Sequence, residues 1–532
     1  MQSDSAPQAA IISRQTSSIK KDSSSGDRFA IFGSMALFAV ILALMTQRHE
    51  MYLDEAQAWL VTRDHRNIFD LIHHLRYEVH PALWYLLLYL PTHLHLPMVW
   101  MQCINYALSL ATAWMILTYR RLPFLIRTLL LYGVLFFFMA VVARNYMLAS
   151  FLLIGAARCL LAERPRRWTA IFLLALAINT HFFAIPIATG IFLWLYWIGN
   201  STNMKIPMDR LKDRTMRAAV GILGLALLTC FFTLRPAPDV YAPEYHIAHA
   251  SSTDYLVLGV GKIWNYFVPF NLEALSKPNQ YQTAPLTGVE ILDAFLTICL
   301  WLLALSVLPG RRSRWFMITA SLLWMAAVWP TVHLPLQSHC TFLATSYIIA
   351  LMIGSADNSD RPWLPDHFSQ PFLFLLLGMQ ISLCFFYCFE EWQYPFSGAK
   401  AAATWLESSG LATRPLVFQS DVPGPAILGY AGVASAYYPG CYSRGSFLMF
   451  SRCWDSKRQI SSEELQALRR QFNSAPIVIS QWQIDEVSLH QLGLRLAYTS
   501  PHSWAWGNED VFIYESGNDH SQSQISKPER FR

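Results

Sequence analysis

The stretch FAIFGSMALFAVILALM (residues 29–45), followed closely by MYLDEAQAWLVTRD (residues 51–64), decides the fold class. The first stretch is an uninterrupted apolar run close to the roughly 20 residues that cross a bilayer as a helix. Similar blocks recur along the 532 residues, of which 54% are hydrophobic and 14% charged. Apolar residues gathered in blocks predict an α-helical polytopic membrane protein rather than a soluble fold.

The charged residues indicate topology rather than a polyanionic partner. The formal net charge is only +5, and the basic residues cluster in short loops. Such clusters orient membrane helices, so no nucleic acid partner is expected. Residues 1–28 are polar, show no packing periodicity and carry no cleavage pattern. They are predicted to be a disordered cytoplasmic tail and not a signal peptide.

One assignment of about eleven spans puts the basic loops on the cytoplasmic side. The expected spans are 29–46, 99–118, 128–143, 146–162, 168–180, 182–198, 218–234, 288–308, 315–331, 340–354 and 370–389. The N-terminus is then cytoplasmic and the C-terminal segment lies outside. Counting residues 80–97 as a further span would put the next basic loops on the wrong face. That segment, with its prolines and histidines, is interpreted as re-entrant or interfacial.

Two long loops of the transmembrane domain (residues 29–389) are expected on the outer face, at 47–98 and 235–287. In the first loop, Ile68, Leu71, Ile72 and Leu75 form one apolar stripe at helical spacing. Such a helix is expected to lie flat on the membrane surface. The second loop repeats the pattern, with the apolar residues Leu256, Ile263, Trp264, Phe267 and Val268. Together the two helices could roof a cavity open to lipid and water.

Residues 390–532 differ in composition and are predicted to form a small extracytoplasmic α/β domain. The expected strands are PLVFQS (415–420), PIVIS (476–480) and DVFIYES (510–516). Between them, Ser461 and Glu464 have the spacing of a helix capping box. Cys441 and Cys453 are the two cysteines of this segment. A disulfide between them would suit an oxidising compartment, and the sequence leaves free thiols equally open.

The adjacent acids Asp54 and Glu55 allow two interpretations. Asp54 could cap the helix that follows, with Gln57 completing a capping box. Alternatively, an acid at the membrane boundary could take a proton from a hydroxyl group, or hold a divalent metal, next to a lipid-borne substrate. A lone Asp-Glu pair without a further acid does not specify a cation. Composition alone leaves these interpretations open.

A wider stretch resembles a known family. LDEAQAWLVTRD and the following LRYEVHPALWYLL (75–87) are similar to the first outer loop of bacterial GT-C membrane glycosyltransferases. This family is related to protein O-mannosyltransferases and lipid A aminoarabinose transferases. ARNYMLASFLL (143–153) and NTHFFAIP (179–186) resemble later family elements in the same order. The resemblance covers residues 29–200 and weakens beyond them.

The resemblance implies an inverting transfer of a sugar from a polyprenyl-phosphate donor at the outer face of a bacterial inner membrane. The acceptor could be a cell-envelope glycan, a lipid or a protein. Asp54 is then the expected general base and Glu55 its support or a metal ligand. The expected donor-binding residues are Glu78, His80, Arg144, Tyr146, His181 and His339. Arg144 is the candidate for holding the phosphate, because a guanidinium grips phosphate oxygens at two points.

The sequence departs from the family before the last spans. Where relatives often carry a basic Arg-Tyr element, this chain reads HLPLQSHCTF (333–342), with His333 and His339. Two other classes remain open, namely a lipid or solute transporter and a non-catalytic scaffold. A transporter usually carries ionisable groups at mid-membrane, and the expected spans contain almost none. The polar groups gather at one face instead, which favours interfacial chemistry.

Overall fold

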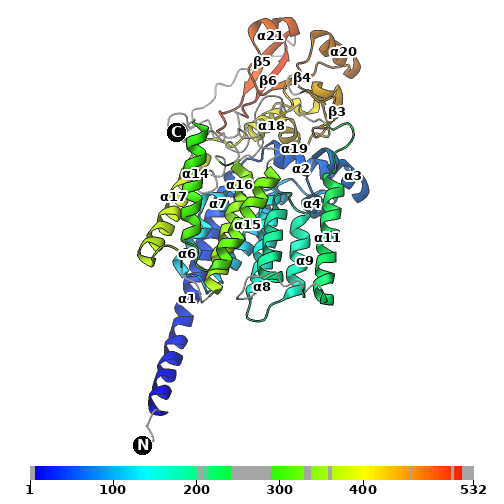
Figure 1. Ribbon diagram of the computed structural model, residues 1–532. Helices are drawn as coiled ribbons and strands as arrows, with labels where there is room; N and C mark the ends of the chain where they lie inside the picture. The colour runs from blue at the N-terminus through cyan, green and yellow to red at the C-terminus, as the bar shows by residue number, and fades with distance from the viewer. Residues whose placement is uncertain are drawn as a thin grey trace, which may run out of the picture.

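The computed structural model describes residues 6–517 apart from 79, 200–208, 210–211, 241–259, 261–288, 329–336, 358–361, 456–457 and 505–508. A bundle of helices carries a small α/β domain at one end, and the N-terminal helix projects from the other end (Figure 1). The bundle helices are α1 (Ala6–Arg48), α2 (Leu53–Asp64), α3 (Ile68–Glu78), α4 (Leu83–His93), α5 (Val99–Leu117), α6 (Phe124–Leu131), α7 (Val134–Val141), α8 (Asn145–Leu161), α9 (Arg167–Ile178), α10 (Ala184–Ile191), the π-helix η1 (Phe192–Trp197), α11 (Arg214–Leu234), α14 (Glu290–Ser306), α15 (Arg311–Val328), α16 (Gln337–Ala356) and α17 (Asp366–Gln393).

Three helices are long and apolar enough to cross a membrane, where the sequence predicts about eleven spans. They are Gly26–Arg48, Arg214–Leu234 and His367–Gln393, among the described residues. The other apolar helices are shorter or more polar. The expected span 128–143 is divided into α6 and α7 at Tyr132 and Gly133. The helix α5 has 19 residues but includes the buried polar residues Gln102 and Asn105, which lower its hydropathy.

Two further expectations for the bundle can be compared with the structure. Residues 6–28 belong to α1, whereas the sequence predicts a disordered tail. A helix already nucleated by the apolar run can extend through this segment, because each added residue needs no new nucleus. The helix α4 has only 11 residues and contains Pro91. Because α9, an expected span, has only 12 residues, the length of α4 does not distinguish a span from the re-entrant or interfacial segment predicted for 80–97.

The predicted surface helix of the first outer loop is present as α3, but its apolar stripe is only partly exposed. Leu71 and Leu75 are fully buried in the protein, while Ile68 and Phe69 are exposed. The corresponding helix predicted for the loop 235–287, with Leu256, Ile263, Trp264, Phe267 and Val268, lies outside the described residues.

The α/β domain is confirmed. Its elements are α18 (Ala399–Ser408), η5 (Leu411–Thr413), β1 (Leu416–Phe418), α19 (Gly424–Tyr430), β2 (Ala436–Tyr438), η6 (Pro439–Cys441), β3 (Ser443–Gly445), α20 (Ser462–Phe472), β4 (Ile477–Ser480), α21 (Glu486–Leu492), β5 (Leu494–Thr499) and β6 (Phe512–Ser516). The strand order is β3-β2-β1-β4-β6-β5, parallel for β2-β1-β4 and antiparallel elsewhere. The three strands predicted from the sequence correspond to β1, β4 and β6. Ser461 caps α20 by accepting from the Glu464 backbone, as its spacing predicts.

The α/β domain is attached to the bundle by buried contacts. Its helix α19 packs on α2, and the hydroxyl of Tyr430 accepts from the Met51 backbone at 2.6 Å. Gln57 of α2 pairs with the backbone of Leu448, donating to its carbonyl at 2.8 Å and accepting from its amide at 2.9 Å. One continuous apolar core therefore runs from the helices into the sheet, which fixes the domain over α2.

Candidate active site

An ion pair at the domain-facing end of the bundle joins two predicted site residues. The Arg144 guanidinium donates to the Asp54 carboxylate at 2.7 Å, and the Tyr52 hydroxyl donates to the same oxygen at 3.2 Å. Asp54 comes from the first turn of α2, and Arg144 is the residue before α8. The Asp54 side chain is 35% exposed and that of Arg144 is 12% exposed. The pair is thus shielded but still accessible to a ligand.

The alternative that Asp54 merely caps a helix is wrong. The helix α2 begins at Leu53 with Tyr52 as its cap residue, so Asp54 lies inside the helix. Glu55, not Asp54, reaches back to the Tyr52 backbone, accepting at 3.3 Å. Gln57, the expected partner in the capping box, instead contacts Glu78 and Leu448. The Asp54 carboxylate therefore pairs with Arg144 and does not cap the helix.

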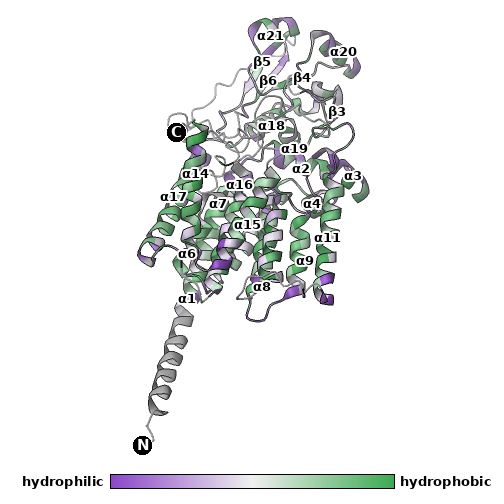
Figure 2. Cartoon of the chain, viewed as in Figure 1, coloured by the Kyte–Doolittle hydropathy of each residue, from purple (hydrophilic) through white to green (hydrophobic). Residues whose placement is uncertain are grey.

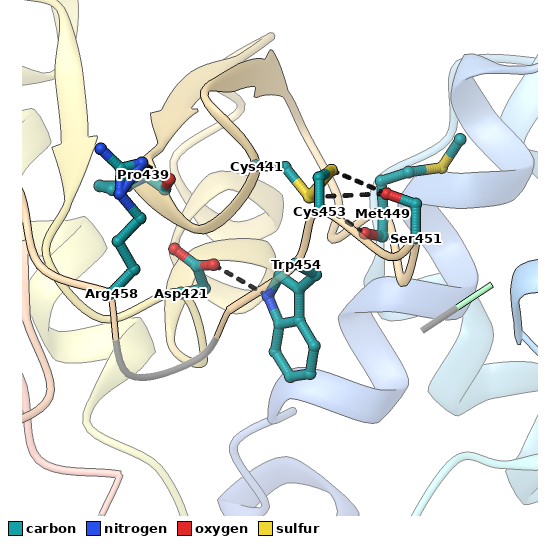
Figure 3. Close-up of a disulfide and its surroundings, with 8 residues drawn as sticks. All are labelled: Asp421, Pro439, Cys441, Met449, Ser451, Cys453, Trp454 and Arg458. Carbon is teal, nitrogen blue, oxygen red and sulfur yellow. Dashed lines mark hydrogen bonds between the residues drawn. A yellow bond between two sulfur atoms is a disulfide. The ribbon is translucent and has the colours of Figure 1, made fainter. Parts of the chain in front are cut away.

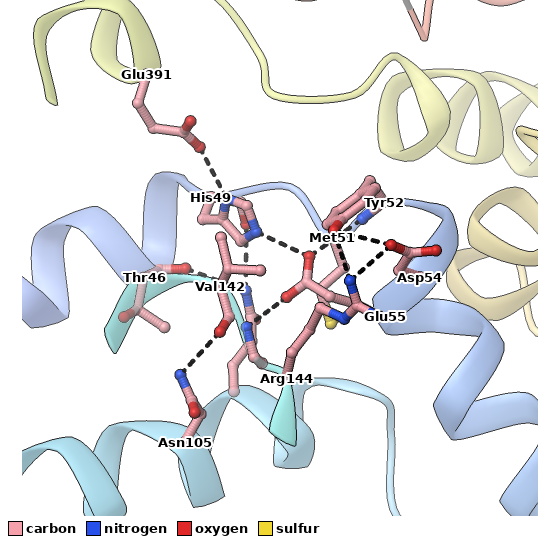
Figure 4. Close-up of polar contacts among 12 residues, drawn as sticks. Thr46, His49, Met51, Tyr52, Asp54, Glu55, Asn105, Val142, Arg144 and Glu391 are labelled. Carbon is pink, nitrogen blue, oxygen red and sulfur yellow. Dashed lines mark hydrogen bonds and ion pairs between the residues drawn. The ribbon is translucent and has the colours of Figure 1, made fainter. Parts of the chain in front are cut away.

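Glu55 lies behind the pair in a fully buried network (Figure 4). Its carboxylate accepts from the Ala143 backbone at 2.7 Å and pairs with the His49 ring at 2.9 Å. The other ring nitrogen of His49 contacts Glu391 at 3.1 Å. Burial alone would lower the pKa of His49, but the Glu55 and Glu391 carboxylates outweigh it and raise that pKa to about 10. His49 is therefore a buried cation between two anions.

This arrangement is compatible with the supporting role that was one of the two roles expected for Glu55. By binding the Ala143 amide, Glu55 holds the α7–α8 connection that carries Arg144. Asn105 holds the same connection from α5, donating to the carbonyls of Ala140 at 2.8 Å and Val142 at 3.2 Å. The position of the Arg144 guanidinium is thereby determined from two sides.

Four other predicted site residues form a cluster next to Arg144. The Arg144 guanidinium lies 5.1 Å from the centre of the Tyr146 ring, a cation–π contact. The His181 ring centre lies 5.1 Å from that of Tyr146, 5.8 Å from that of His80 and 5.9 Å from that of His339. The sequence thus predicted a set of residues that four separate segments bring together. His333 lies outside the described residues.

The histidines next to Arg144 are kept neutral. Burial lowers the pKa of His80, and the nearby Arg144 cation lowers it further. Burial also lowers the pKa of His181, with His80, His339 and Arg144 acting in the same direction. Neutral imidazoles can donate and accept hydrogen bonds without adding charge. The cluster therefore combines a permanent cation with neutral polar rings, a set suited to a phosphate joined to a sugar.

Glu78 is connected to the site only indirectly. Its side chain is 5% exposed and accepts from Gln57 at 2.8 Å. Its backbone carbonyl contacts the His80 ring at 2.6 Å, which orients that imidazole. Glu78 thus supports the cluster from behind, and no contact between its side chain and Arg144 or His181 is found among the described residues.

The C-terminal domain contributes an acid that sequence reasoning missed. Glu509 is buried, accepts from the Leu53 backbone at the start of α2 and lies near enough to Asp54 to feel its charge. Burial raises the pKa of Glu509 to about 8.

Four other residues of the site were also not predicted from the sequence, namely His49, Tyr52, Asn105 and Glu391. For Tyr52, its position next to the Asp-Glu pair was a usable signal, whereas Glu509 and Glu391 have no local motif.

A disulfide closes the loop that meets α2. Cys441 and Cys453 are bonded, with their Cα atoms 5.0 Å apart (Figure 3). The loop that they close contains Leu448, the partner of Gln57. Beside the disulfide, Trp454 donates its indole N–H to the buried Asp421 carboxylate at 2.9 Å. The disulfide that the sequence left undecided is thus formed, and it restrains the segment covering α2.

Neither metal-binding clusters nor similar proteins indicate a ligand for this site. Within the described ranges, no group of three or more His, Cys, Asp or Glu side chains is arranged to hold a metal ion. Comparisons of the chain with protein-family models, curated proteins and solved structures found no match.

Replacing His49 by Leu should destabilise the protein by about 3–5 kcal/mol, because it leaves two buried carboxylates without their cation. The pKa of His49 is higher in the folded protein than the roughly 6.5 of an unfolded chain. Its stabilisation is therefore complete below that value and is lost as the pH rises through about 10. Thermal unfolding in detergent should show this decline in the wild type and not in His49→Leu. His73→Leu, on the exposed side of α3, is the control, and equal melting of the two variants would contradict the network.

Proposed function

We propose that the chain is a membrane glycosyltransferase, which moves a sugar from a polyprenyl-phosphate donor to an acceptor at the outer membrane face. The observation that carries the proposal is the accessible Asp54–Arg144 pair beside three clustered histidines. The pair offers a base and a phosphate-binding cation within one site, which is what such a transfer requires. The resemblance of the first outer loop to GT-C enzymes points to the same chemistry.

The surface of the bundle supports a membrane location. Large apolar side chains are exposed along α11, including Leu225 at 61% and Phe231 at 61%, and along α14 and α17. The bundle is hydrophobic over most of its height, with polar residues at its ends (Figure 2). Soluble monomers rarely expose contiguous apolar patches of this extent. In the proposed topology, the shorter helices complete the expected spans, the N-terminus is cytoplasmic and the α/β domain lies outside.

The proposed reaction is a single displacement. The donor phosphate binds Arg144, whose five N–H groups allow it to keep Asp54 as a partner. The acceptor hydroxyl transfers its proton to Asp54 as its oxygen bonds to the anomeric carbon. The bond from that carbon to the phosphate oxygen breaks with inversion, and polyprenyl phosphate leaves with the electron pair. Arg144 stabilises the negative charge that develops on the leaving phosphate.

The neutral histidines and Tyr146 fit the sugar side of the site. A protonated histidine beside the anomeric carbon would oppose the positive charge that develops there, whereas His80 and His181 have lowered pKa values. The ring of Tyr146 is fully buried against Arg144 and His181. The cluster can therefore orient sugar hydroxyls without competing with Arg144 for the phosphate.

Mass spectrometry of envelope glycans and lipids from cells with and without the gene tests the function. We expect one glycan or glycolipid to lose the mass of one sugar residue when the gene is absent, and plasmid-borne wild-type protein to restore it. A transporter would change the distribution of a lipid but not the number of sugars on it. Identical glycan and lipid profiles with and without the gene would contradict the proposal.

A further inference from the structure

A polar cavity lies at the end of the bundle opposite the α/β domain. It has a volume of about 400 Å³, within the usual range of ligand pockets. Its walls come from the ends of α8, η1 and α16, the start of α9 and α15, and the residue Arg121 after α5. These ends meet below the apolar bundle, where hydrophilic residues gather in the picture (Figure 2). The cavity is thus far from Asp54 and is not used in the proposed transfer.

The lining of this cavity combines cationic and apolar residues. Arg121, Arg167 and Arg312 line it, and Glu163 is its acid. Arg312 is held in place by donating to the Asp357 carboxylate at 2.7 Å and to the Gly199 carbonyl at 2.8 Å. Leu160, Leu161, Leu195 and Ala356 form the apolar wall.

We propose that this cavity binds a phosphate-bearing anion, with an anionic phospholipid headgroup or a soluble phosphate as the two sources of the same chemistry. Guanidinium groups match phosphate oxygens in geometry and charge. Arg312 is paired with Asp357, so Arg121 and Arg167 against Glu163 leave an excess of one positive charge at the cavity. Basic pockets between helices at a membrane surface typically accept anionic headgroups, and the apolar wall suits the glycerol and first methylene groups of a lipid.

The arginines also have a simpler explanation, since basic residues at helix ends orient a membrane protein without binding a ligand. That explanation requires charge but no cavity. It predicts that every exposed arginine at this end of the bundle has the same effect when it is replaced. Arg164 and Arg217 are exposed at the same end and do not line the cavity. They provide a matched control for Arg121 and Arg167, because each pair removes two positive charges.

The test is a titration of the purified full chain in a neutral detergent, with thermal unfolding as the readout. The probes are short-chain phosphatidylglycerol, inorganic pyrophosphate and, as the neutral reference, short-chain phosphatidylcholine. We expect phosphatidylglycerol or pyrophosphate to raise the melting temperature, with an apparent affinity about 10–100-fold weaker in Arg121→Gln/Arg167→Gln. The control Arg164→Gln/Arg217→Gln should bind like the wild type. A response to the lipid alone identifies a headgroup as the source, and a response to pyrophosphate as well identifies a phosphate site open to soluble anions.

Two results would overturn the proposal. One is equal stabilisation by phosphatidylglycerol and phosphatidylcholine with no effect of pyrophosphate. The other is an equal loss of affinity in both double variants, which would assign the effect to general charge. A double variant that melts lower without ligand remains informative, because the change in melting temperature on titration is measured within each protein. None of these readouts depends on sugar transfer, so the proposal stands or falls separately from the proposed function.

Discussion

Replacing Asp54 by Asn is expected to reduce sugar transfer about 10²–10⁴-fold, the usual cost of losing a general base. Asn has nearly the same shape and can still accept a hydrogen bond from Arg144 and Tyr52, which now contact the Asp54 carboxylate. It cannot take the proton of the acceptor hydroxyl. The measurement is transfer of label from a radiolabelled polyprenyl-phosphate sugar pool in cell membranes, normalised to protein level.

The control for this experiment is Asp70→Asn, which removes an exposed carboxylate from the neighbouring helix α3. It should transfer at the wild-type rate. Melting of Asp54→Asn close to that of the wild type would confirm that the loss is chemical. Full activity in folded Asp54→Asn would show that Asp54 is not the base and would direct attention to Glu509, the acid of the α/β domain near the start of α2.

Replacing Arg144 by Lys is expected to lower transfer about 10²–10³-fold, the usual cost of removing one preorganised donor to a developing anion. Lysine keeps the charge, which preserves the attraction to Asp54, but it loses the planar fork that can hold Asp54 and a phosphate together. It also loses the stacking on Tyr146. The rate at saturating donor should therefore fall more than the stability does.

Arg63→Lys is the matched control for Arg144→Lys, because Arg63 pairs with Asp64 on the exposed side of α2. The two variants should melt similarly, and Arg63→Lys should retain wild-type transfer. Wild-type turnover in Arg144→Lys, and again in Arg144→Ala, would mean that another cation holds the leaving phosphate.

The parts of the fold that sequence predicts are those determined by local pattern. Short alternating or β-branched runs gave β1, β4 and β6, and the Ser461–Glu464 spacing gave the start of α20. The strands β2, β3 and β5 were missed. The strands β2 and β3 take their conformation from pairing with each other, and β5 from pairing with β6. The helix break at Gly133 and the shortness of several apolar helices depend on packing inside the bundle, which hydropathy does not register.

In the candidate site, too, some features follow from the local sequence and others depend on packing. Asp54, Arg144 and the histidines lie at ends of apolar runs, and it was the resemblance to the GT-C enzymes that singled them out there. The partners of Glu55 were not predictable, because it pairs with His49 and, through His49, with Glu391, 342 residues further along the chain. Only the folded chain shows that one acid of the pair faces Arg144 while the other is buried against the Ala143 amide.

The most direct test of the account is the fate of the lipid when purified wild-type protein, in neutral-lipid nanodiscs, is given the polyprenyl-phosphate sugars extracted from cells lacking the gene. The account predicts that one of these lipids is consumed in the presence of an envelope extract containing the acceptor, that free polyprenyl phosphate appears in equal amount, and that the sugar is recovered on the acceptor. Unchanged polyprenyl-phosphate sugars after incubation with folded protein and acceptor extract would contradict it.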